Sequence, residues 1–98
     1  MTLAAEQLDR LAAYFAATPL KAVYLFGSYA RGDADAQSDI DLLLETDGVR
    51  RGALDLARMR RELGELLSIP VDLCEQHKVL KYARAHIWRE RVLIYRAA

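Results

Sequence analysis

The sequence contains one cysteine, two histidines and no long hydrophobic run among its 98 residues. Cys74 alone cannot form an internal disulfide or a CxxC zinc site, and it is typical of a reducing cytoplasm. No apolar run approaches the roughly 18 residues that a membrane span needs. Residues 1–10 carry acidic side chains and lack the apolar segment of a secretory signal. We therefore expect a cytoplasmic protein with a single domain over residues 1–98, without a membrane association.

The net charge is zero, but the two halves of the sequence have opposite charge. Residues 1–49 hold eight acidic and three basic side chains, whereas residues 50–98 hold six acidic and eleven basic ones. Four aspartates fall between positions 33 and 41, and charges packed so closely repel one another unless water or a cation lies among them. The basic half is compatible with binding to a nucleic acid. The net charge of zero and the pI of about 6.7, however, disfavour a nucleic-acid partner.

Hydrophobic periodicity predicts alternating helices and strands. Apolar residues at helical spacing favour an opening helix with Thr2 as its N-cap, and Ser28 is expected to cap a short helical turn that ends before Gly32. The helices are predicted over residues 3–17, 53–67 and 79–89, and the strands over 21–26, 39–45, 71–74 and 92–95. This order predicts an α/β (α+β) fold, in which helices pack on a small mixed β-sheet.

Chemistry-bearing residues gather around the first two predicted strands. The first strand runs into Gly27 and Ser28, where a residue without a side chain, exposed N–H groups and a hydroxyl suit a phosphate. Asp39 and Asp41 are two apart on a strand and therefore point to the same side. Asp72 is an acid inside the third strand, flanked by apolar residues. Carboxylates this close favour a divalent cation, and oxygen ligands select Mg²⁺ or Mn²⁺.

The glycine–serine pair, the Asp-x-Asp strand and the later Asp72 resemble the signature of the nucleotidyltransferase superfamily related to DNA polymerase β. Arg31-Gly32, Ser38 and the apolar run after Asp41 make the likeness closer. The sequence is most similar to the minimal nucleotidyltransferases, the MNT or MntA type, which are encoded beside HEPN-domain partners. The resemblance implies a polymerase β-like nucleotidyltransferase core.

The resemblance also implies roles for individual residues. The nucleotide-binding residues for ATP would be Gly27, Ser28 and Arg31. The catalytic residues, which would also ligate Mg²⁺ or Mn²⁺, would be Asp39, Asp41 and Asp72. Asp72 would in addition lower the pKa of an acceptor hydroxyl, which attacks the α-phosphorus as pyrophosphate departs.

The acceptor is expected to come from another chain, because the core leaves almost no residues for an acceptor-binding domain. The resemblance implies a HEPN toxin, an RNase that would be silenced when AMP is transferred to one of its tyrosines. Two alternatives stay open. The protein could be a non-catalytic antitoxin that only covers its partner, or a nucleotidyltransferase that acts on a small molecule or a nucleic acid held by a separate chain.

Overall fold

The computed structural model describes residues 1–46 and 54–98, which form a four-stranded mixed sheet with helices on both faces. The strand order is β3-β2-β1-β4, and β1 pairs antiparallel with both β2 and β4, while β2 and β3 are parallel. The strands are β1 (Ala22–Phe26), β2 (Ile40–Glu45), β3 (Val71–Glu75) and β4 (Val92–Arg96). The predicted mixed sheet with packed helices is confirmed.

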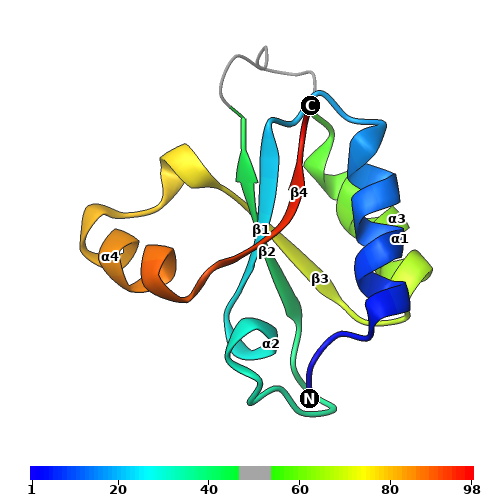
Figure 1. Ribbon diagram of the computed structural model, residues 1–98, viewed down its shortest axis with the longest axis horizontal. Helices are drawn as coiled ribbons and strands as arrows, with labels where there is room; N and C mark the ends of the chain where they lie inside the picture. The colour runs from blue at the N-terminus through cyan, green and yellow to red at the C-terminus, as the bar shows by residue number, and fades with distance from the viewer. Residues whose placement is uncertain (47–53) are drawn as a thin grey trace.

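The helices form two layers, and two short turns connect other elements (Figure 1). In Figure 1, α1 and α3 lie together on one side of the sheet, whereas α4 lies on the other side. A single-turn helix, α2, follows β1 directly, and a 3-10 turn, η1, follows β3. The bounds are α1 (Ala5–Ala16), α2 (Ser28–Arg31), α3 (Leu56–Leu67), η1 (Gln76–Lys78) and α4 (Lys81–Glu90).

Alternation along β2 decides which face of the sheet each side chain joins. Ile40, Leu42 and Leu44 are fully buried in the larger core cluster, which α1 and α3 complete. Leu43 is buried in the smaller cluster, against which Ile87 and other residues of α4 pack. Burying one such leucine stabilises the fold by roughly 1.5–3 kcal/mol. Because side chains alternate across a strand, Asp41 lies on the same face as Leu43.

The ends of two helices differ from the sequence predictions for local reasons. The first helix has Ala4 rather than Thr2 at its N-cap, and the Ala4 N–H donates to Gln7 Oε1 at 2.7 Å. The last helix begins at Lys81 instead of residue 79, because η1 precedes it and Val79 is buried in the smaller core cluster.

The other predicted element bounds agree within a few residues. The helix predicted over 53–67 begins at Leu56, where Asp55 is the N-cap and accepts a hydrogen bond from the Arg58 N–H at 3.1 Å. Residue 53 lies outside the described residues. Among residues 1–46 and 54–98, no helix is both long enough and apolar enough to cross a bilayer.

Candidate functional site

The turn between β1 and β2 is a one-turn helix closed by glycine at both ends. Gly27 has φ 74° and ψ −155°, and its carbonyl accepts from the N–H groups of Ala30 and Arg31 at 3.0 and 3.1 Å. Gly32 has φ 86°, in the left-handed region, and donates its N–H to the Ser28 carbonyl at 2.9 Å. The expected cap at Ser28 is therefore wrong: Gly27 is the N-cap and Ser28 the first helical residue, because only glycine readily adopts the Gly27 dihedral angles.

Gly27 also adjoins the carboxylate of Asp41. Phe26 is the register partner of Asp41 in the β1–β2 pair, so the chain leaves β1 beside that side chain. A Cβ atom built on Gly27 would lie 3.1 Å from Asp41 Cγ and would overlap a carboxylate oxygen. The absence of a side chain at position 27 therefore makes room for Asp41, in addition to any ligand.

The parallel pairing of β2 and β3 brings two of the three predicted acids side by side. Asp41 and Asp72 are register partners, and Asp39 lies immediately before β2. Burial raises the pKa of Asp41 first, and the charges of Asp72 and then Asp39 raise it further, while Arg31 acts in the opposite direction. The charges of Asp39, Asp72 and Arg31 therefore all act on the ionisation of Asp41 beside the turn.

The acids do not form a closed metal cage. Within the part of the chain that the structure describes, no group of three or more His, Cys, Asp or Glu side chains is arranged to hold a metal ion. Asp39 and Asp72 are exposed, and Asp72 Oδ1 lies 3.8 Å from Arg60 Nε. The donor set nevertheless fits Mg²⁺ or Mn²⁺, because Mg²⁺ usually takes one or two carboxylates and completes its shell with water and substrate phosphates.

The sequence analysis missed two charged residues that contact the predicted site residues. Glu90 Oε1 accepts from Arg31 Nη1 at 3.2 Å, across 59 positions of sequence. Arg60 approaches Asp72, as described above. Glu90 carries a weak sequence signal, because an acid at the end of a predicted helix faces an unfavourable dipole unless it has a partner. Arg60 carries no such sequence signal, since it is one of several arginines in α3.

Cys74 shares a strand with Asp72, yet its environment does not favour a nucleophile. Burial raises the pKa of the thiol, and the charges of Asp72 and Glu75 raise it further. The reactive form of cysteine is the thiolate, which a raised pKa suppresses. Cys74 is a partly buried free thiol whose environment favours the unreactive protonated form.

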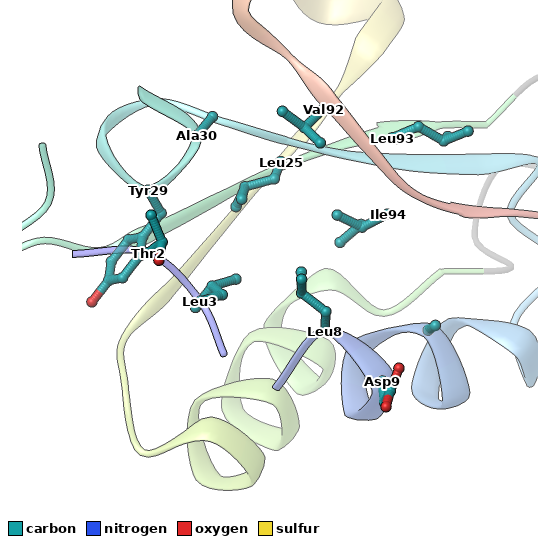
Figure 2. A pocket seen from close by; sticks show the side chains of 11 residues that line it. Thr2, Leu3, Leu8, Asp9, Leu25, Tyr29, Ala30, Val92, Leu93 and Ile94 are labelled. Carbon is teal, nitrogen blue, oxygen red and sulfur yellow. The ribbon is translucent and has the colours of Figure 1, made fainter. Parts of the chain in front are cut away.

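An apolar pocket of about 340 Å³ lies at the β4 edge of the sheet (Figure 2). Figure 2 shows side chains from the start of the chain, α1, α2 and β4 around it. Asp39, Asp41 and Asp72, all within the described residues, do not line this pocket, so the apolar pocket and the acidic site are separate features. The lining consists of Thr2, Leu3, Leu8, Asp9, Ala12, Leu25, Tyr29, Ala30, Val92, Leu93 and Ile94.

Comparison with known proteins assigns the family. Residues 5–94 match the model of the nucleotidyltransferase domain. The chain belongs to the nucleotidyltransferase domain family. A candidate protein adenylyltransferase of Methanocaldococcus jannaschii is 37% identical over 73 residues, which cover 74% of this chain and 77% of that protein. The predicted membership of the family is confirmed, and the protein is a nucleotidyltransferase.

Solved structures agree with the fold of this nucleotidyltransferase. A toxin–antitoxin structure with AMP-PNP matches with a TM-score of 0.76 at 18% identity, over 92% of this chain and 73% of the other. A complex of a tri-AMPylated Shewanella oneidensis HEPN toxin with an MNT antitoxin matches with a TM-score of 0.67 at 17% identity, over 94% of this chain and 71% of the other. Likeness at this identity establishes the shared fold.

Proposed function

We propose that this nucleotidyltransferase transfers AMP from ATP to a hydroxyl group, most simply a tyrosine, of a HEPN toxin and thereby neutralises it. The observation that carries the proposal is the pairing of Asp41 with Asp72 beside the Gly27 turn. Two carboxylates adjoining a glycine–serine turn suit phosphoryl transfer, in which positioning and charge stabilisation supply most of the catalysis. The similar protein named as an adenylyltransferase and the HEPN–MNT complex support the choice of donor and acceptor.

The residues of this chain would divide the work as follows. The N–H groups and hydroxyl at Ser28 and the charge of Arg31 would bind the triphosphate, and Gly27 would let it approach the backbone. Asp39, Asp41 and Asp72 would hold Mg²⁺ or Mn²⁺, which neutralises charge on the phosphates and lowers the pKa of the attacking hydroxyl.

The exposed carboxylate of Asp72 is available to accept the acceptor's proton. The hydroxyl oxygen then forms a bond to the α-phosphorus, and the bond from that phosphorus to pyrophosphate breaks. The AMP group stays on the partner, pyrophosphate leaves, and the proton resides on Asp72. Atoms and charge balance without a further reactant.

The test is intact-mass measurement of a HEPN partner after incubation with the purified protein, ATP and Mg²⁺. We expect the wild type to add one or more adenylyl units and Asp41→Asn to add none. Glu65→Gln, an exposed acid on α3, is the matched control and should retain the activity. If no mass is added while the protein and its Asp41→Asn variant both neutralise the partner, the protein is a binding antitoxin. Transfer to a nucleic acid or small molecule instead would place the acceptor in another class.

A further inference from the structure

The guanidinium of Arg31 is held between two carboxylates from different parts of the chain. Arg31 Nε donates to Asp33 Oδ2 at 3.1 Å, and Arg31 Nη1 donates to Glu90 Oε1 at 3.2 Å. The positive charge also lowers the pKa of Asp41, so Arg31 acts on the acidic site as well. Among the described residues, the hydrogen bonds of this guanidinium engage Nε and Nη1, which leaves Nη2 for another acceptor.

Glu90 differs from Asp33 in burial and in position. The Glu90 side chain is 16% exposed, whereas that of Asp33 is 61% exposed, so water screens the Glu90 contact less. Glu90 is also the last residue of α4, where the helix dipole disfavours a negative charge. A largely buried carboxylate at that position depends on a cation, and the Arg31 guanidinium supplies it. The His86 ring also lies close, with Nε2 3.4 Å from Glu90 Oε2.

We propose that Glu90 is a positioning residue for nucleotide binding: it holds Arg31 so that the remaining N–H groups of the guanidinium meet the triphosphate. The inference rests on the nucleotide-binding part of the proposed function. A free arginine loses side-chain entropy when it is fixed, and a contact made before binding removes part of that cost. The Glu90 contact crosses from α4 to α2, so it fixes the turn that carries Ser28 as well as the guanidinium.

The experiment measures AMP-PNP binding in the presence of Mg²⁺ by calorimetry for single and double variants. We expect Glu90→Ala to weaken binding about five- to tenfold and Arg31→Ala to weaken it about ten- to a hundredfold. In the Arg31→Ala background, Glu90→Ala should have no further effect, because the two residues act through one guanidinium. Glu90→Gln should restore most of the affinity, since its amide oxygen still accepts from Nη1. Glu6→Ala is the control. It removes the exposed ion pair between Glu6 and Arg10 on α1, and it should bind AMP-PNP as the wild type does.

A transfer assay with a HEPN partner separates positioning from general destabilisation. Glu90→Ala should raise the KM for ATP with kcat nearly unchanged, whereas an unfolding variant would lower kcat by the fraction unfolded. The inference is overturned if Glu90→Ala binds AMP-PNP with wild-type affinity, or if Glu90→Ala lowers the affinity as much in the Arg31→Ala background as in the wild type. It is also overturned if Glu90→Gln does not restore binding. Nucleotide binding without transfer to the partner contradicts only the proposed function, and a wild type that binds no AMP-PNP overturns both.

Discussion

The carboxylate of Asp41 occupies the space that a side chain on Gly27 would take. Asp41 Cγ would lie 3.1 Å from a Cβ at that position, and the backbone there has φ 74° with ψ −155°. The glycine–serine turn and the Asp-x-Asp strand are therefore fitted to each other before any ligand binds. Position 27 is a test of the acidic site as much as of phosphate binding.

We expect Gly27→Ala to lower both stability and nucleotidyl transfer. Backbone strain at this φ and ψ costs about 1–3 kcal/mol, and the overlap with Asp41 displaces a predicted metal ligand. Gly32→Ala is the matched control, because Gly32 has φ 86° but, among the described residues, its Cβ would meet only Thr2 Cγ2, at 3.8 Å. Thermal unfolding and transfer assays should show a loss of stability in both variants and a loss of transfer confined to Gly27→Ala. Equal transfer by the two variants would contradict the fit between Gly27 and Asp41.

Asp41→Asn should stabilise the metal-free protein while it abolishes transfer. The folded-state pKa of Asp41 is raised, so its ionised form opposes folding once the pH exceeds the ordinary carboxylate range. At pH 7 in EDTA we expect the Tm of the variant to exceed that of the wild type by a few degrees. The difference should vanish below the ordinary carboxylate pKa, where Asp41 is neutral in both states. Asp72→Asn should raise the Tm less than Asp41→Asn does, because Asp72 is exposed and lies near Arg60. A Tm of Asp41→Asn below that of the wild type would contradict the prediction.

Tyr14 is expected to make stability fall at alkaline pH. Burial and the hydrogen bond that its hydroxyl donates to Glu62 Oε1 at 2.9 Å raise the pKa of Tyr14 to about 12. This contribution is fully present below the unfolded pKa of about 10 and is lost as the pH rises through the folded pKa. Tyr14→Phe should lose about 0.5–1.5 kcal/mol at neutral pH and flatten the decline between roughly pH 10 and 12.

Urea unfolding at several pH values measures the Tyr14 effect directly. Tyr82→Phe is the control, because Tyr82 is 85% exposed and should change neither the stability nor its pH dependence. A decline above pH 10 that is equally steep in wild type and Tyr14→Phe would show that other groups cause it.

Arg60→Met should strengthen the binding of Mn²⁺ in the presence of AMP-PNP. Arg60 Nε lies 3.8 Å from Asp72 Oδ1, and a cation at this distance competes with a metal for the carboxylate. Exposed ion pairs contribute about 0.2–1 kcal/mol, so the affinity should rise roughly 1.5- to 5-fold. Methionine retains the length of the apolar stem, and Arg61→Met, which changes another exposed arginine of α3, is the control. Weaker Mn²⁺ binding by Arg60→Met would mean that the arginine supports Asp72.

The sequence was sufficient to predict the sheet and the family because the informative residues are close together in the chain. Gly27, Ser28, Asp39 and Asp41 lie within one strand–turn–strand segment, so spacing and alternation place them without tertiary information. The pairing of Asp41 with Asp72 is different, since it follows from the parallel docking of β3 on β2. The resemblance to the family implied that Asp72 joins Asp39 and Asp41 in one site, whereas the register that pairs Asp72 with Asp41 is known only from the structure.

Long-range contacts between charged side chains were beyond the sequence. The Arg31–Glu90 contact joins residues 59 positions apart. The place of Glu90 at the end of a helix indicates that the acid needs a partner, but nothing in the local pattern identifies Arg31 as that partner. The N-cap of α2 was misplaced for a different reason: serine is the commoner cap, and only the backbone angles show that Gly27 takes that position.

The parallel register of β2 and β3 has a consequence for how this protein fails. Because adjacent side chains on a strand point to opposite faces, a slip of β3 by one residue would put Val71 or Leu73 in place of Asp72 and turn the acid toward the apolar core. The same slip would expose two core side chains, so a misaligned molecule loses its chemistry and its stability together. The pairing itself therefore disfavours molecules that are well folded but inactive. The alternation of apolar side chains along β3 fixes the register and thereby the position of Asp72.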